Sequence, residues 1–138
     1  MNMLKTSLAG GIALAVLAHG LSIQAGPYPD ELGICYRFEG DDRTQLEPCV
    51  ISAGYGTGAH YVTLHWLDGT ISNISWINYC PEGDYEELGF CAYQVNDQVA
   101  EPYERNLFMA VTTVEDPDNL PCYRILETDD SVCYRFNP

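Results

Sequence analysis

The side chains of this chain that are best suited to chemistry are its six cysteines. A thiol can act as a nucleophile, bind a metal or form a disulfide. An even number of cysteines in a short chain with a secretory leader indicates a disulfide framework. A zinc site is a weaker alternative, because no two cysteines are spaced as Cys-x-x-Cys. The six are Cys35, Cys49, Cys80, Cys91, Cys122 and Cys133.

Cysteines that are neighbours in the sequence are expected to pair, because each such pair brackets a turn-like segment. A two-residue turn at Glu127-Thr128 would set the last two cysteines opposite each other on antiparallel strands, within bridging distance. The competing arrangement places the Cys-Tyr-Arg segments side by side and exchanges their partners. The expected bridges are Cys35–Cys49, Cys80–Cys91 and Cys122–Cys133.

Histidine and serine offer a second kind of chemistry. His60 and His65 lie an odd number of positions apart on an expected strand, so they point to opposite faces and cannot chelate one metal ion. A hairpin in this region would place His65 beside Ser72, which resembles a nucleophile and its base. No G-x-S-x-G motif accompanies the pair, so we expect polar strand histidines rather than serine catalysis.

Carboxylates form the third group, with 20 aspartates and glutamates in the chain. Two carboxylates at a suitable separation can hydrolyse a glycosidic bond, but most acidic pairs lie in expected loops, where aspartate favours turns. The Asp-Pro-Asp-Asn stretch at 116–119 offers oxygen ligands for weak calcium binding, with a plain turn as the alternative. No other metal and no cofactor is expected. The loop carboxylates expected to contact a partner are Glu86, Glu87, Asp116 and Asp118.

Short β-rich segments separated by turn residues must position these groups, and no convincing amphipathic helix is present. The predicted fold is all-β or mainly β: a single small disulfide-linked antiparallel sheet, sandwich or partly open barrel built from hairpins. The predicted strands are 34–39, 48–53, 60–67, 70–77, 90–95, 106–114, 122–126 and 132–136.

The clearest hairpin joins residues 60–67 and 70–77 through Asp68-Gly69. A two-residue Asp-Gly loop favours a type I′ turn, whose twist matches the flanking strands. This turn would set His65 opposite Ser72 and Tyr61 opposite Trp76.

The first 25 residues are expected to be a signal peptide, with Lys5 before a short apolar run and Ala25 at the cleavage site. Residues 26–138 then form a single disulfide-linked β-domain that is secreted or periplasmic. Lipidation at Cys35 is rejected, because Ile34 is too large for the position before a lipidated cysteine.

The charge of the chain limits its partners. Residues 26–138 carry five arginines, no lysine and all 20 carboxylates, a formal charge of −15. Such a surface repels nucleic acid and anionic membrane and favours basic proteins or divalent cations. Solubility, or adaptation to a salty medium, is the alternative reading of the same charge.

The chain also resembles a loose group of small secreted or periplasmic bacterial proteins of unassigned function. The likeness rests on cysteines, glycines and aromatic residues, and it leaves the Cys80–Cys91 segment unmatched. It implies a bacterial disulfide-linked β-domain and brings no catalytic residues. The similar stretches are Cys35, 48–58, 103–106, 122–124 and 132–134.

Three functions remain open. The leading hypothesis is a non-catalytic exported binding module that engages a basic protein, for example as an inhibitor. The second is a small extracellular hydrolase with a carboxylate pair, and the third is a structural or envelope-associated protein without a discrete ligand. Two convergent desolvated carboxylates would favour the hydrolase, whereas an acidic loop or an exposed aromatic patch would favour the binding module.

Overall fold

The computed structural model describes residues 26–56, 59–77 and 93–137, and this part of the chain consists of strands and turns. The all-β class is confirmed. The expected signal peptide and the predicted contacts Glu86 and Glu87 lie outside the described residues. The strands are β1 (Gly26–Pro27), β2 (Glu31–Glu39), β3 (Asp42–Gly56), β4 (Ala59–His65), β5 (Ile71–Ile77), β6 (Tyr93–Val95), β7 (Gln98–Arg105), β8 (Val111–Thr112), β9 (Leu120–Ile125) and β10 (Asp130–Phe136).

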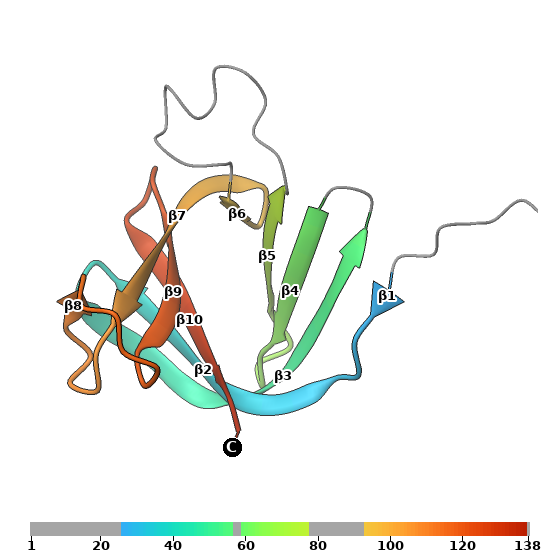
Figure 1. The fold of residues 1–138 in the computed structure, drawn as a ribbon, viewed down its shortest axis with the longest axis horizontal. Coiled ribbons are helices and arrows are strands. Elements are labelled where there is room, and N and C mark those ends of the chain that lie inside the picture. The colour runs from blue at the N-terminus through green and yellow to red at the C-terminus, as the bar shows by residue number, and fades with distance from the viewer. Residues whose placement is uncertain (1–25, 57–58, 78–92, 138) are drawn as a thin grey trace, which may run out of the picture.

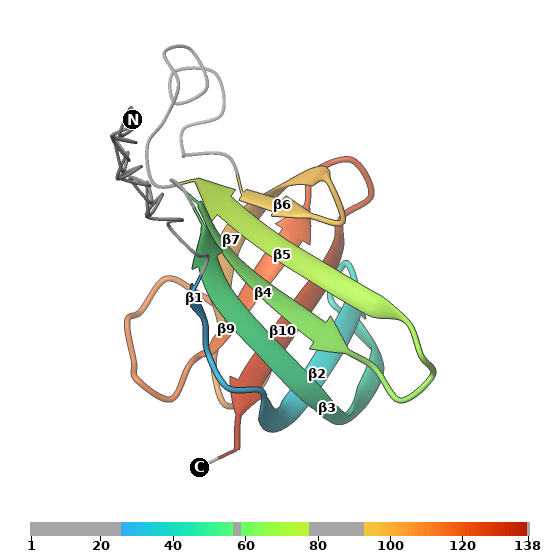
Figure 2. The ribbon, with the colours of Figure 1, turned by 90° about the vertical axis from the view of Figure 1, so that its right-hand side faces the viewer.

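Eight of these strands close into an antiparallel barrel in the order β3-β2-β10-β9-β7-β6-β5-β4, and β4 pairs again with β3 (Figures 1 and 2). Closure depends on the 15 residues of β3, because its first part pairs with β2 and its last part with β4. The short strands β1 and β8 pair with β3 and β7 beside this ring. The expected sheet, sandwich or partly open barrel is therefore a closed barrel, in which each of the eight strands has a neighbour on both sides.

Inward-facing side chains fill the barrel. On β4, Val62 and Leu64 are buried and alternate with half-buried positions, and Trp66 continues the series beyond the end of the strand. They pack against Ile51 of β3 and Ile74 of β5. An eight-stranded barrel is just wide enough to be filled by side chains or to hold one small ligand. The buried inner cluster is Cys35, Cys49, Ile51, Val62, Leu64, Trp66, Ile74, Val95, Ala100, Ile125, Val132 and Tyr134.

A second apolar cluster lies on the outer face. Cys133 and Tyr134 are consecutive on β10, so their side chains point to opposite faces, and Tyr134 belongs to the inner cluster. The outer cluster has four buried members, with Tyr36, Tyr103 and Met109 packed against them. The buried members are Phe38, Leu120, Cys122 and Cys133.

Arg105 connects the outer cluster to a distant turn. Its side chain is 1% exposed, and its guanidinium lies 3.9 Å from the centroid of the Phe38 ring. Its Nη1 donates to the carbonyl of Met109 (2.8 Å), and its Nη2 donates to the carbonyl of Gly40 (3.0 Å) and to Asp41 (3.2 Å). Arg105 thus attaches the β7–β8 hairpin to the β2–β3 turn, and Figure 1 shows these two segments side by side.

The disulfide predictions are confirmed where the structure describes the cysteines. Cys35 is bonded to Cys49 and Cys122 to Cys133, and no described cysteine is free. Cys122 lies directly opposite Cys133 as predicted, although the loop between their strands spans 126–129 rather than two residues. The predicted Cys80–Cys91 bridge lies outside the described residues. Two disulfides indicate an oxidising, extracytoplasmic environment.

The hairpin around Asp68-Gly69 is antiparallel as predicted, but its predicted register is wrong by one residue. His65 lies opposite Ile71 rather than Ser72. Because strand side chains alternate between faces, the shift exchanges the two faces of β5. Ile71 is therefore exposed, and Ile74 enters the core.

The cause of the shift is a loop of three residues instead of two. The Trp66 amide donates to the Thr70 carbonyl and the Gly69 amide donates to the Trp66 carbonyl, both at 3.0 Å. Gly69 has φ 82°, so a type I turn is followed by a left-handed glycine that forms a G1 bulge. The predicted pair Tyr61–Trp76 is displaced in the same way.

The strand prediction fails between residues 98 and 114. The predicted strand 106–114 is mostly turn, with only β8 as strand, and β7 was not predicted. Pro102 argues against a central strand, because proline has no amide to donate. The barrel accommodates Pro102 because β6 pairs with residues 98–100 and β8 with residues 104–105, which leaves only β9 beside it.

A series of aromatic rings in contact runs across several strands of the barrel. His60 stacks on Trp76 with ring centroids 5.4 Å apart, and Tyr123 stacks on Tyr134 at 6.3 Å. Such contacts add to the free energy gained from burial alone. The rings in this series are Tyr28, Tyr55, His60, Trp76, Tyr93, Tyr123, Tyr134 and Phe136.

Two of these tyrosines predict an alkaline limit to stability. Burial raises the pKa of Tyr123 and Tyr134 above the ordinary value, and for Tyr123 the neighbouring Tyr134 adds to the effect. The unfolded chain releases these protons from about pH 10, while the native state retains them. The free energy of unfolding is therefore expected to fall as the pH rises above about 10.

Urea unfolding at a series of pH values, with tyrosinate absorbance as a second signal, tests this expectation. Tyr123→Phe removes one of the two groups and should lose less stability over the same alkaline interval. Equal alkaline losses in Tyr123→Phe and the unmodified protein would contradict the assignment.

Candidate functional site: the turn end of the barrel

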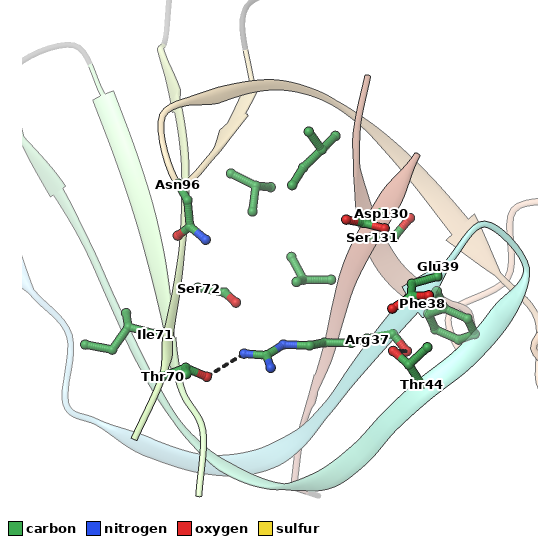
Figure 3. Close-up of a pocket in the computed structure, with 13 residues that line it drawn as sticks. Arg37, Phe38, Glu39, Thr44, Thr70, Ile71, Ser72, Asn96, Asp130 and Ser131 are labelled. Atoms are coloured by element: carbon green, nitrogen blue, oxygen red, sulfur yellow. Dashed lines mark hydrogen bonds between the residues drawn. The ribbon is translucent and has the colours of Figure 1, made fainter. Parts of the chain in front are cut away.

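A pocket of about 310 Å³ opens at the end of the barrel where four hairpin turns lie (Figure 3). These turns join β2 to β3, β4 to β5, β6 to β7 and β9 to β10, and we call this end the turn end (right-hand side of Figure 2). Space remains here because Ser72, opposite Leu64, is a small inward-facing residue. The pocket is lined by Arg37, Phe38, Glu39, Thr44, Thr70, Ile71, Ser72, Val95, Asn96, Ile125, Asp130, Ser131 and Val132.

The lining is amphipathic. Val95, Ile125 and Val132 are buried members of the inner cluster and form an apolar floor. Glu39 and Asp130 lie opposite each other on β2 and β10, at the edge of the pocket. Glu39 is exposed and Asp130 is half-buried. The pocket can therefore take a group with an apolar body and a polar or cationic end.

Arg37 crosses the pocket from β2 towards β4 and β5, as Figure 3 shows. Its Nη1 donates to Gln45 Oε1 (2.8 Å) and its Nη2 donates to Thr70 Oγ1 (2.6 Å). Its guanidinium lies 4.0 Å from the centroid of the Trp66 ring. These contacts hold Arg37 as part of the pocket wall.

Asp68 balances the charge of Arg37, since its carboxylate lies 3.7 Å from Arg37 Nη1. The hydroxyl and the amide of Thr70 both donate to Asp68 Oδ1. These hydrogen bonds, with a smaller effect of Arg37, hold the pKa of Asp68 below its ordinary value. Asp68 therefore stays ionised at neutral pH, and Arg37 gives the pocket little net positive charge.

All four turns at this end carry carboxylates. Asp41 is paired with Arg105 and Asp129 with Arg124, in addition to the pair formed by Asp68. The other five turn-end carboxylates form no ion pair within the described part of the chain. Arg43, at the start of β3, is an exposed positive charge in the same region of the sequence, but five unpaired carboxylates outnumber it. The turn end is therefore negatively charged. Its carboxylates are Glu39, Asp41, Asp42, Asp68, Asp97, Glu127, Asp129 and Asp130.

The predicted contacts Asp116 and Asp118 lie elsewhere, in the loop between β8 and β9, and both are exposed. Asp116 Oδ1 accepts a hydrogen bond from the Asp118 amide at 2.8 Å, which closes a turn. Asp118 borders a second, more open pocket of about 460 Å³ beside the end of β10. In the described ranges, no group of three or more histidine, cysteine or acidic side chains could hold a metal ion, and calcium binding at 116–119 stays a prediction.

The histidines point to opposite faces, as predicted. His60 stacks on Trp76, whereas His65 Nε2 lies 3.1 Å from Ser52 Oγ. Ser72 faces inward and accepts a hydrogen bond from Trp66 Nε1. The nucleophile–base pair of His65 and Ser72 is therefore not formed.

The turn end was missed because its acidic groups are scattered through the sequence, each in a turn of its own. One local signal was available at Asn96-Asp97. Both residues have positive φ (50° and 64°), as the two central positions of a type I′ hairpin turn require, and asparagine and aspartate tolerate this conformation. That turn identifies the β6–β7 hairpin and hence β7.

No protein-family model, curated protein or solved structure matches this chain. Fold and site therefore define the class: a small disulfide-linked β-barrel with an acidic pocket at its turn end. The resemblance to small bacterial exported proteins stays a prediction. Within the described residues, no helix is long and apolar enough to cross a membrane.

Proposed function

We propose that this protein is a non-catalytic binding module, secreted or periplasmic, that engages a basic protein through the turn end of its barrel. One observation carries the proposal. Glu39 and Asp130 face each other at the edge of a pocket whose floor is apolar. A lysine or arginine side chain has the matching chemistry, because it joins an apolar stem to a cationic head.

The surrounding charge supports this partner class. The chain has a formal net charge of −14, and the turn end collects eight carboxylates from four hairpins. Complementary charge accelerates encounter and orients the partner more than it raises affinity. The same field repels nucleic acid and anionic lipid, so neither is proposed as a ligand.

The geometry favours recognition over hydrolysis. A glycosidase needs one carboxyl group that remains protonated, and a desolvated environment is the usual means of achieving this. Glu39 is exposed to solvent, and Arg37 is fixed by Gln45 and Thr70 rather than directed at a substrate.

The test is titration with an oligolysine peptide at low salt, followed by calorimetry. The double variant Glu39→Gln/Asp130→Asn is expected to bind about tenfold more weakly, since two close charge interactions are lost. Affinity in the unmodified protein should fall as the salt concentration rises from about 50 mM to about 500 mM.

The matched control is Asp116→Asn/Asp118→Asn, which changes the net charge equally but lies outside the pocket. It should change the affinity less than about threefold. Equal weakening in the two double variants would show that net charge alone attracts the peptide. Absence of binding at low salt would also reject the proposal.

A further inference from the structure

The loop that joins β7 to β8 presents the most exposed large apolar side chain among the described residues. Phe108 is 90% exposed and its neighbour Leu107 is 61% exposed. Val111 and Val114, a few residues later, are exposed as well. Single apolar residues on a surface are ordinary, but a fully projecting phenylalanine with three exposed aliphatic residues close to it in the sequence marks a candidate interaction surface.

The conformation of this loop is fixed by hydrogen bonds. The Asn106 amide donates to the Ala110 carbonyl (2.9 Å), and the Met109 amide donates to the Asn106 carbonyl (2.8 Å). The Asn106 side-chain oxygen also accepts from the amides of Phe108 (2.9 Å) and Ala110 (3.1 Å). Two backbone and two side-chain hydrogen bonds within five residues make this a rigid tip.

The loop also contains one strained residue, Met109, which attaches it to the outer cluster and to Arg105. Met109 has φ 63°, a left-handed conformation that costs energy for a residue with a long apolar side chain. Met109 packs on the outer cluster, and its carbonyl accepts a hydrogen bond from the buried Arg105. The strained residue faces the protein while Phe108 faces solvent, so the loop is built to project the aromatic ring.

The charges on Asp41, which Arg105 connects to the loop, and on the segment that follows β8 define a partner. Arg105 is the one basic residue between positions 105 and 119, and it is buried. Its ion-pair partner Asp41 is exposed, and Glu115, Asp116 and Asp118 follow β8 as exposed carboxylates. An apolar tip with acidic neighbours complements an apolar pocket with a basic rim.

We propose that Phe108 is a protein-docking anchor that enters an apolar pocket, rimmed by lysine or arginine, on a partner protein. A loop that hydrogen bonds already order loses little conformational entropy on binding, and an exposed aromatic side chain on such a loop is a typical source of concentrated binding energy. The anchor goes beyond the proposed function, because neither Leu107 nor Phe108 lines the turn-end pocket.

The experiment places a photo-crosslinking amino acid at position 107 and exposes the full mature protein to the envelope and medium fractions of the producing organism. The crosslinked partner is then purified, and its affinity is measured for the unmodified protein and for Phe108→Ala. The proposal expects a basic protein that binds Phe108→Ala at least about tenfold more weakly. Leu32→Ala is the matched control, since Leu32 is 66% exposed on β2 and belongs to neither the β7–β8 loop nor the four turns of the turn end, and it should bind as the unmodified protein does.

Four results would overturn the anchor: a crosslink only to a second copy of this chain, binding of phosphatidylcholine vesicles that depends on Phe108, no crosslinked protein, or equal losses in Phe108→Ala and Leu32→Ala. Thermal unfolding of Phe108→Ala checks that the barrel is intact. Phe108→Ala should also bind oligolysine normally, so the anchor and the turn-end pocket can fail separately.

Discussion

Replacing Arg105 with methionine is expected to lower the free energy of unfolding by roughly 3–5 kcal/mol, a large part of the total for a small domain. Arg105 donates hydrogen bonds to the carbonyls of Gly40 and Met109 and to the Tyr103 hydroxyl, and it stacks on Phe38. Methionine fills part of the same volume but donates nothing, so these acceptors lose their partner. The exposed Asp41 carboxylate contributes little to the loss, because water solvates it.

Urea unfolding followed by tryptophan fluorescence measures this change. Arg43→Met is the control, because Arg43 is exposed and its side chain forms no hydrogen bond or ion pair within the described part of the chain. The control should change the unfolding free energy by less than about 0.5 kcal/mol. If the two variants are equally stable, Arg105 does not hold the β7–β8 hairpin to the β2–β3 turn.

Removing the Cys35–Cys49 bridge by a double change to alanine is expected to cost about 3 kcal/mol. The bridge closes a loop with a sequence separation of 14 and joins β2 to β3 inside the barrel. On the chain-entropy account, its loss enlarges the ensemble of the unfolded chain. Alanine is preferred to serine, because serine would bury a hydroxyl in the inner cluster.

The matched comparison is the double alanine variant of Cys122 and Cys133. Its loop has a separation of 11, so the entropic part of the loss should agree within about 0.5 kcal/mol. A larger difference between the two variants would come from packing, because the first bridge lies in the inner cluster and the second in the outer cluster. A loss below about 1 kcal/mol in the Cys35–Cys49 variant would contradict the stabilising role of that bridge.

The site was harder to predict than the disulfides. In the sequence, Glu39, Asp68 and Asp130 each lie at or beside a turn, where acidic residues are common, so nothing marks them as parts of one site. Only the closure of the barrel brings their turns to one end and leaves a pocket between them. Phe108 was hidden for a different reason: residues 106–114 have the composition of a strand, yet the hydrogen bonds of Asn106 make a turn there.

Local features of the sequence were sufficient for the all-β class, for most strands and for the Cys35–Cys49 and Cys122–Cys133 bridges, because alternation and turn residues act over a few positions. The tertiary structure alone decided the one-residue register of the β4–β5 hairpin, the acceptance of Pro102 within β7 and the pairing of β3 with β4 that closes the barrel. Register depends on whether the turn holds two or three residues, and the two alternatives differ little in local energy. Packing of Ile74 against Val62 and Leu64 resolves that choice, because only one register buries all three side chains together.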